Sequence, residues 1–385
     1  MIRLCVVGFV AYCSYAICRA PLLPLLAREL GASPAQVGLV VAASTITGAL
    51  LKLPAGAWSD VLGRRPLLLA AAAVFALLPF SYLAAGGLSV LIAIRFVHGS
   101  ATAIMGPVMS ATISDLAPAA RRATWLSTYS TVQGAGQAVA PILAGALIAR
   151  GRYDLAFVIS GGIGVCAPLL LVGIPLPQAR HTGASFGVSR FWNGIGEVLR
   201  ERRILIASTT HAIYYVMNGT LTAFLPLFAQ DRAGLSAIQI GWLFGLQTVT
   251  TLAIRPLIGA ASDRLGRRGA IVAGLLTCAA GVLSISVCAG APGLYSAVLL
   301  YAAGVAMTTA ATSAYITDVT PRARFGAAHG VFGTIYDIGD AGGPLVGGML
   351  IGVIGYTATF QFVALLATVT GLLFFGLSRE PRIHT

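Results

Sequence analysis

The amino-acid sequence predicts an all-α integral membrane protein with twelve transmembrane helices in two six-helix bundles. Hydrophobic residues make up 57% and charged residues 10% of the 385 residues, and mean hydropathy is +0.87. Water-soluble domains of this length carry far more charge. Twelve apolar runs are each long enough to cross a bilayer, which takes about 20 residues. A decapeptide that follows the second run returns after the eighth, which indicates that one half-molecule has been duplicated.

The twelve predicted spans divide evenly between the two halves of the chain. They cover residues 4–26, 37–57, 67–86, 89–112, 125–149, 155–174, 204–230, 238–261, 269–289, 293–316, 327–352 and 356–378. The first bundle takes residues 1–174 and the second takes residues 204–385. The polar, arginine-rich residues 175–203 are expected to form a cytoplasmic linker. The first run has no small-residue cleavage site, which favours a retained span over a signal peptide.

The repeated decapeptide places an acid, a turn glycine and two arginines in a tight hinge between two spans. The key residues are Gly56, Asp60, Gly63, Arg64 and Arg65 in the first copy and Gly259, Asp263, Gly266, Arg267 and Arg268 in the second. The aspartate can accept backbone N–H groups at the start of the following helix, while the arginines stay with water and headgroups. The same offset of 203 residues relates Gln36, Gly38, Asp115, Pro141 and Gly145 to Gln239, Gly241, Asp318, Pro344 and Gly348.

The formal net charge of +13 predicts an orientation in the membrane and not a nucleic-acid partner. The basic residues are dispersed in short hinges and form no single stripe. Nearly all arginines outside the spans fall on one side of a twelve-span chain, which predicts that both termini lie in the cytoplasm. The six cysteines lack the spacing of metal ligands, so no metal or cofactor is expected.

Polar side chains recur at helical spacing within several spans, and polar faces of membrane helices point inward. The residues predicted to face a cavity are Tyr15, Arg19, Arg95, His98, His211, Tyr215 and Asn218. Arg95 and the two histidines have a simpler interpretation beside the functional one. The simpler interpretation of Arg95 is a buried donor to backbone carbonyl groups, and a lone histidine is usually a satisfied hydrogen-bonding residue. The predicted spans of the first half hold no acid that could pair with Arg19, which leaves an anionic substrate, a carbonyl cluster or an acid of the eleventh span as its partner.

Two acids and two cations inside the membrane suggest different roles. Asp337 and Asp340 are three residues apart near the middle of the eleventh span, and the fifth span has no acidic equivalents. Two carboxylates this close do not both ionise readily, so one is expected to hold a proton, which predicts a role in proton coupling. Lys52 and Arg255 are repeat equivalents close to the hinges, and they are expected to reach the membrane surface and to act structurally.

The fifth and eleventh spans carry glycine-rich runs around a proline, at 136–145 and 339–348. Small residues at this density let helix backbones approach closely, and a proline bends a span. The runs therefore indicate either tight packing or a bend that the halves use when they move against each other.

Three of these motifs resemble those of the major facilitator superfamily. They are the hinge decapeptide, the run from Arg95 to Gly99 and the glycine-proline runs, and together they are closest to the drug:proton antiporter branch. The resemblance implies a cavity lined by spans 1, 4, 7 and 10, alternating access, and a coupling role for Arg95. It also implies that Asp60 and Asp263 anchor neighbouring helix ends when the cavity opens outward. Val61 departs from the basic residue usual in the hinge, Ala140 replaces a glycine, and spans 1 and 4 hold no acid.

The resulting hypothesis is a secondary active transporter in the inner membrane, not an enzyme, that exports amphipathic compounds in exchange for protons. A carrier of small organic anions is the alternative, favoured by Arg19, Arg95 and the two histidines. The expected partners are a small-molecule substrate, protons and the lipid bilayer, and the expected state is a monomer. The run from Gly183 to Gly187 matches a hydrolase motif, but that motif requires a preceding strand, and none is expected here.

Overall fold

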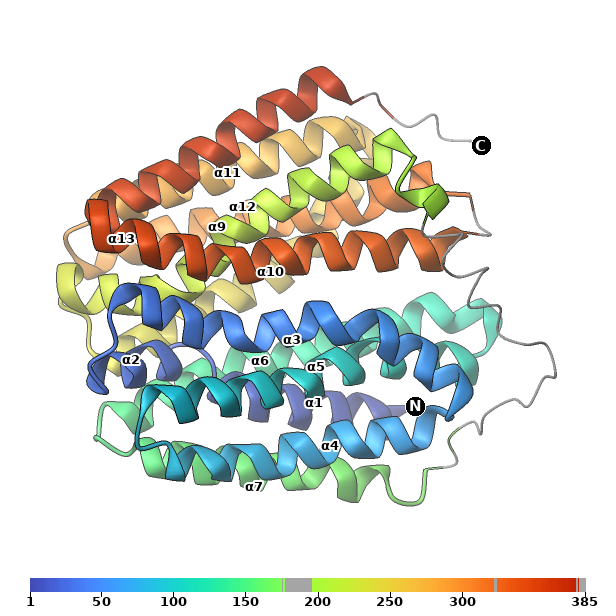
Figure 1. Cartoon of the computed structure of the whole chain (residues 1–385). Helices are drawn as coiled ribbons and strands as arrows, with labels where there is room; N and C mark the ends of the chain where they lie inside the picture. Colours follow the sequence, from blue (N-terminus) through green and yellow to red (C-terminus); the bar gives the residue numbers. More distant parts are fainter. Residues whose placement is uncertain (175, 177–195, 322–323, 379, 381–385) are drawn as a thin grey trace.

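A computed structural model describes residues 1–174, 176, 196–321, 324–378 and 380, and the described chain is helical throughout (Figure 1). Most of the predicted linker, together with the side chains of Asp60, Gly259 and Asp263, lies outside the described part. The helices are α1 (Ile2–Ile17), α2 (Leu22–Glu29), α3 (Pro34–Val61), α4 (Arg64–Ser81), α5 (Leu88–Leu116), α6 (Arg122–Ile148), α7 (Tyr153–Leu171), α9 (Arg202–Ala233), α10 (Ala237–Leu265), α11 (Arg267–Val287), α12 (Ala291–Val319) and α13 (Phe325–Leu377).

The described residues contain eleven continuous helical runs of membrane length, and the last holds two of the predicted spans. This run covers 51 residues, roughly twice what a single crossing needs. Gly355 interrupts it with a non-helical backbone at φ 75°, a conformation that favours glycine. The first run is also divided, because α1 ends before Pro21 and α2 continues the crossing. The twelve predicted spans are therefore confirmed.

Two helices, α3 and α10, begin earlier than the predicted apolar runs, because polar residues cap their first turns. Ser33 accepts a hydrogen bond from the backbone N–H of Gln36, whose side chain accepts one from the N–H of Ser33. Ser236 and Gln239 repeat this capping box at the start of α10. Reciprocal capping of this kind satisfies N–H groups that have no partner within the helix. It explains why a glutamine recurs at the repeat offset.

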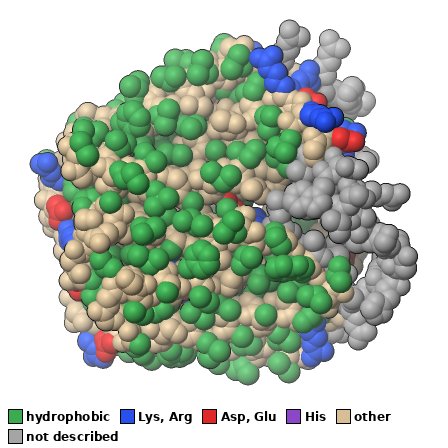
Figure 2. All heavy atoms as spheres, in the orientation of Figure 1, with side chains coloured by type: hydrophobic (Ala, Val, Ile, Leu, Met, Phe, Trp, Pro, Cys, Tyr) green, Lys and Arg blue, Asp and Glu red, His purple; other side chains and the backbone are tan. Residues whose placement is uncertain are grey.

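The helices form two bundles, α1 to α7 and α9 to α13, which lie side by side (Figure 1). The N-terminus and the end of α13 lie at one end of the molecule, which we call the terminal end. The opposite end, which we call the far end, carries α2 and the connection between α6 and α7. Hydrophobic side chains cover the band between the ends, whereas basic and acidic ones gather at the ends (Figure 2). Exposed side chains such as Leu257 and Val353 belong to this apolar surface, as lipid contact requires.

The two hinges have the same geometry. Gly63 and Gly266 each precede a helix with φ of 89° and 88°, which a side chain would strain. Arg64 Nε donates to Asp115 at 3.3 Å, and Arg267 Nε donates to the repeat-equivalent Asp318 at 2.9 Å. Each arginine thus joins its hinge to the last turn of the neighbouring helix, α5 or α12.

The remaining hinge arginines differ between the halves. Arg65 is exposed. Arg268 lies 3.9 Å from the ring centroid of Phe375, and its backbone N–H donates to Glu380 at 3.1 Å. The second hinge therefore contacts the C-terminal segment.

Two symmetric helix crossings join the bundles toward the far end. A Cβ on Gly38 would lie 2.1 Å from the carbonyl oxygen of Pro344, and a Cβ on Gly241 would lie 2.4 Å from that of Pro141. These distances leave room for no side chain, so α3 packs directly on α13 and α10 on α6. The glycine-proline runs therefore contribute close packing between the halves. Arg28 Nη1 adds an ion pair to Asp231 Oδ1 at 2.6 Å across the same end.

Candidate functional site

A cavity of about 490 Å³ lies between the two bundles. It is lined by Tyr12, Tyr15, Arg19, Ser44, Thr45, Gly48, Lys52, Thr102, Ala103, Gly106, Pro107, Ser110, Tyr129, Ser130, Gln133, Gln137, Tyr215, Tyr336, Asp337 and Asp340. The first half supplies most of this wall, from α1, α3, α5 and α6. The second half supplies it from α9 and α13, and no described residue of α12 reaches it. The lining spans are therefore the first, second, fourth, fifth, seventh and eleventh, whereas the sequence predicted the first, fourth, seventh and tenth.

The cavity extends from Arg19 toward the terminal end. Ser110 lies in the last two turns of α5, and Tyr129 lies two turns into α6. The ends of these helices, at Leu116 and Arg122, belong to the terminal end (Figure 1). The glycine crossings hold the bundles together toward the far end, so the cavity lies on the terminal side of these crossings.

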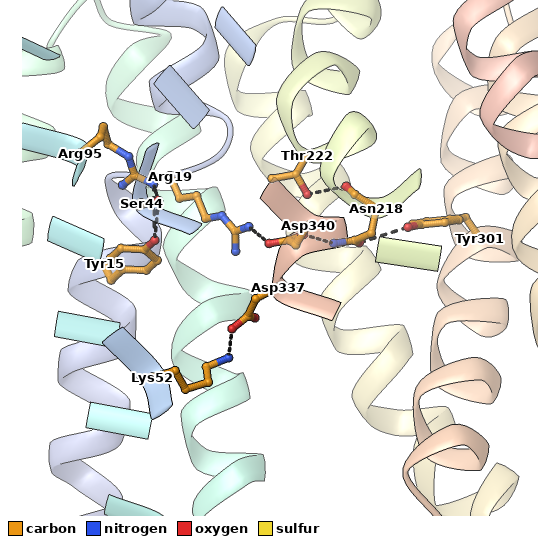
Figure 3. A network of polar contacts seen from close by, with 10 residues as sticks. All are labelled: Tyr15, Arg19, Ser44, Lys52, Arg95, Asn218, Thr222, Tyr301, Asp337 and Asp340. Carbon is orange, nitrogen blue, oxygen red and sulfur yellow. Dashed lines mark hydrogen bonds and ion pairs between the residues drawn. The ribbon is translucent and has the colours of Figure 1, made fainter. Parts of the chain in front are cut away.

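Two ion pairs cross the cavity from one half to the other (Figure 3). Arg19 Nη2 lies 3.4 Å from Asp340 Oδ2, and Lys52 Nζ forms a close ion pair with Asp337 Oδ2. The cations come from the first half and the acids from the second. Among the partners that the sequence left open for Arg19, the structure selects an acid of the eleventh span.

The predicted position of Lys52 and the predicted pairing of the two acids were both wrong. The sequence predicted that Lys52 reaches the membrane surface and that Asp337 and Asp340 share a proton with each other. Instead, each acid faces its own cation. Ser44, Gly48 and Lys52 are four residues apart, so they share one polar face of α3. This spacing is the signal that could have placed Lys52 in the cavity. Arg255, its repeat equivalent, is exposed.

Behind Asp340, a chain of hydrogen bonds reaches α12. Asn218 Nδ2 donates to Asp340 Oδ1 at 3.4 Å, and the Tyr301 hydroxyl donates to Asn218 Oδ1 at 3.1 Å. Thr222 donates to the backbone carbonyl of Asn218 at 2.9 Å. Asn218 therefore lies behind the wall and orients the carboxylate, although the sequence predicted that it faces the cavity.

Arg95 is fully buried and lies behind the first-half wall. Its Nη2 donates to Ser44 and, at 3.4 Å, to the Tyr15 hydroxyl. Its Nη1 donates to the carbonyl of Cys18 at 3.4 Å, next to Arg19. No described acid forms an ion pair with this guanidinium. Arg95 thus fixes the position of Tyr15 and of the chain at Arg19, and its positive charge stays uncompensated behind the wall.

The two histidines are buried beside the cavity and do not line it. His98 Nδ1 lies 3.1 Å from the Tyr82 hydroxyl, and its ring meets that of Tyr15 edge-on at 5.0 Å. Its other ring nitrogen, Nε2, is buried without a described hydrogen-bond partner, so the simpler interpretation of a satisfied histidine holds for one ring nitrogen only. His211 stacks on Phe332 at 4.9 Å.

An aromatic pair forms part of the second-half wall. The rings of Tyr215 and Tyr336 stack with centroids 4.7 Å apart, and both side chains line the cavity. His211 contacts both rings from behind, at centroid distances of 5.1 Å and 5.8 Å. Lys52 Nζ lies 4.9 Å from the Tyr336 centroid, a distance at which a cation is attracted to an aromatic face. The cavity therefore presents flat aromatic surfaces beside its charges.

The described residues contain no group of three or more histidine, cysteine or acidic side chains that could hold a metal ion. The cavity instead offers two cations, two carboxylates, hydroxyl groups and aromatic rings. These groups are suited to binding a polar or amphipathic small molecule through ion pairs and stacking.

Comparison with known proteins gives the chain relatives along its full length. The family model described as Major Facilitator Superfamily matches residues 4–240 and 207–385. An uncharacterised MFS-type transporter of Methanocaldococcus jannaschii is 21% identical over 358 residues, which are 92% of each chain. The class E tetracycline resistance protein of Escherichia coli is 24% identical over 85% of this chain and 82% of its own. A crystal structure of the nucleoside transporter NupG covers 98% of both chains with a TM-score of 0.81 and 13% identity.

Proposed function

Because the chain belongs to the Major Facilitator Superfamily, we propose that it is a secondary active transporter that exports amphipathic small molecules in exchange for protons. The site lies in the cavity between the bundles, and transport proceeds by alternating access to it. Membership of this family of transporters supports a role in transport and not in catalysis.

The single observation that carries this proposal is the pair of ion pairs across the cavity. Arg19 with Asp340 and Lys52 with Asp337 connect the two halves at the level of the site. Protonation of either aspartate removes its charge and hence the attraction to its cation. A bound substrate that pairs with the same groups competes with these contacts. Proton binding and substrate binding are thereby coupled to the relative position of the halves.

The direction of transport follows from the proposed orientation. Most of the described arginines outside the spans lie at the terminal end, so we assign this end to the cytoplasm. The cavity then faces the cytoplasm, where an exporter loads its substrate. The likeness to a tetracycline resistance protein and to the multidrug resistance protein MdtM of Salmonella typhimurium supports export of amphipathic compounds.

A carrier of small organic anions is the second candidate, and Arg95 is the observation that favours it. The buried guanidinium has no described acidic partner, so the first-half wall has more positive charge than the second-half wall has negative charge. An anion in the cavity would compensate this excess.

Asparagine variants of the two acids test the exporter proposal in proteoliposomes with and without an imposed pH gradient. The probes are ethidium as a lipophilic cation, benzoate as an anion and 4-(2-aminoethyl)benzoic acid as a zwitterion. The gradient is expected to concentrate at least one probe. Asp337→Asn or Asp340→Asn is expected to abolish this accumulation while downhill exchange of the same probe survives, because asparagine keeps the shape but cannot titrate. Variants that still concentrate the probe like the parent would refute proton coupling through these acids. Exchange of benzoate alone, without an effect of the gradient, would favour the anion carrier.

A further inference from the structure

The charges in the cavity are separated by half. Both cations, Arg19 and Lys52, come from the first half, and both acids, Asp337 and Asp340, come from the second. All four side chains are partly accessible from the cavity, with exposed fractions of 31%, 27%, 10% and 12%. A molecule between the halves therefore meets a positive wall on one side and a negative wall on the other.

This arrangement disfavours ligands of a single charge. A cation that pairs with Asp340 leaves Arg19 without its partner, and an anion that pairs with Arg19 leaves Asp340 without its cation. An unpaired charge is costly in a poorly solvated site. A neutral ligand cannot replace either ion pair. A ligand with one positive and one negative group can pair with both residues at once and leave neither Arg19 nor Asp340 without a partner.

The pair of Arg19 and Asp340 is better suited to open for such a ligand than the pair of Lys52 and Asp337. Its distance of 3.4 Å is longer than an optimal charged hydrogen bond, whereas Lys52 and Asp337 are in closer contact. Asp340 also keeps the hydrogen bond from Asn218 when Arg19 moves away. Arg19 is the most exposed of the four charged side chains, so a ligand reaches it most easily.

The residues around this ion pair fix the orientation of the ligand in the cavity and favour a ligand with an aromatic ring. Arg95 adds positive charge behind the first-half wall, which attracts a carboxylate to that side. Tyr12, Tyr15, Tyr215 and Tyr336 line the cavity around the charges, and a flat ring can stack on such faces. Pockets of about 300–1,000 Å³ hold drug-sized ligands, and this cavity lies within that range.

We infer that the cavity binds aromatic zwitterions, with the ligand carboxylate on Arg19 and the ligand ammonium group on Asp340. The inference rests on the proposed transport function and specifies its substrate class. The ligand takes over both members of the ion pair between the halves, whereas the ion pair of Lys52 and Asp337 remains.

Two matched series of probes test this inference with the purified full-length chain in detergent. Each series has a zwitterion, its methyl ester as the cation and its N-acetyl derivative as the anion. One is built on 4-(2-aminoethyl)benzoic acid and the other on tryptophan, so that two spacings of the charged groups are sampled. Isothermal titration calorimetry at pH 7 is expected to show that, in at least one series, the zwitterion binds about tenfold or more tightly than either derivative. The inference is overturned if neither series shows this preference.

Two charge-removing variants make the test specific to the proposed contacts. Arg19→Gln leaves Asp340 without its cation and is expected to shift the preference by about tenfold toward the methyl ester. Asp340→Asn leaves an excess positive charge and is expected to shift it by a similar factor toward the N-acetyl derivative. A purely structural role of either residue would weaken all three forms equally, and that result contradicts the inference.

A surface variant supplies the control. Arg152 is exposed and pairs with Asp154 outside the cavity, so Arg152→Gln changes the net charge of the protein and should leave the preference unaltered. These titrations use no pH gradient. Gradient-driven transport without a preference for zwitterions refutes only the substrate class, whereas a preference without gradient-driven transport refutes the proton-coupled function.

Discussion

Lys52 shows how one residue can have a role that its repeat equivalent lacks. Lys52 pairs with Asp337 across the halves and approaches the ring of Tyr336, whereas Arg255 is exposed. Both residues lie four positions before a hinge glycine. The cavity has therefore diverged between the two copies, whereas the turn glycine and its arginine–aspartate contact recur in both hinges.

The first prediction at the residue scale concerns the contribution of the ion pair between Lys52 and Asp337 to the stability of the fold. Lys52→Met leaves the partly buried carboxylate of Asp337 without a cation, which is expected to lower the free energy of unfolding by about 1–3 kcal/mol. Adding Asp337→Asn removes the second charge and is expected to recover part of the loss. Denaturant unfolding of the single and double variants in detergent measures both values. Arg255→Met is the matched control, expected to change stability by less than about 0.5 kcal/mol. Equal effects at positions 52 and 255 would contradict the pairing.

Arg95 shows the limit of sequence reasoning for single residues. The spacing of Arg95 and His98 correctly assigned both to an inward face of the fourth span, but an inward face includes layers at different depths. Tyr15 and Ser44 line the cavity and contact Arg95 from that side. His98 is in hydrogen-bond contact with the Tyr82 hydroxyl. The packing of neighbouring helices decides which inward-facing side chain lines the cavity and which lies behind it. The periodicity of a single helix does not contain this information.

Among the structural elements, helix number and order were predictable, and helix ends and partners were less so. The apolar runs identified all twelve spans because lipid contact requires hydrophobic surfaces on every helix. The apolar runs did not include the first turn of α3, because the residues that cap it at Ser33 are polar. The glycine-proline runs indicated close packing, but which helix packs against which followed only from the structure. Once the contact of Gly38 with Pro344 is known, the repeat supplies that of Gly241 with Pro141.

The prediction at the element scale is that these two crossings determine the closure of the far end. Gly38→Ala or Gly241→Ala places a methyl group against a backbone carbonyl that cannot move aside, so either change is expected to separate the bundles at that end. Arg150 and Ala289 are exposed residues of opposite halves at the far end, and spin labels can be attached at both positions. Distances measured between the two labels should include a larger population of long distances in either variant than in the parent.

Gly162→Ala serves as the control for this experiment. A Cβ at Gly162 in α7 meets no atom within 4 Å, so this substitution adds the same methyl group without a clash. Its distance distribution should match that of the parent. If the Gly38 and Gly241 variants also keep the parent distribution, the crossings do not hold the far end closed.

At the scale of the whole molecule, duplication gives the two halves an approximate twofold relation. We expect function to depend on the residues that differ between the halves. The hinges, capping boxes and glycine crossings occur twice, at an offset of 203 residues. The cavity charges do not follow this relation, because the cations belong to the first half and the acids to the second. The repeated features hold the bundles and their hinges, while the unrepeated ones distinguish the two walls and thereby give a ligand one orientation.

The last prediction concerns the ion pair that closes the far end. Arg28 and Asp231 are themselves separated by the repeat offset of 203 residues and meet at 2.6 Å, so they face each other across the approximate twofold axis. Arg28→Asp brings two carboxylates together, and Asp231→Arg brings two guanidinium groups together. Either single reversal is expected to repel the halves and to favour opening of the far end, whereas the double reversal restores an ion pair and hence closure. A shift of about 1.4 kcal/mol changes the ratio of open to closed molecules about tenfold.

A cysteine in the cavity reports this change in intact cells. With the native cysteines replaced by serine, Thr102→Cys places a thiol on the cavity wall. A membrane-impermeant thiol reagent added outside the cells reaches it only through an open far end. Each single reversal should raise the labelling rate about tenfold, and the double reversal should return it to the parent value. If the double variant labels as fast as the single ones, the contact of Arg28 with Asp231 is incidental, and the glycine crossings alone determine whether the far end is closed.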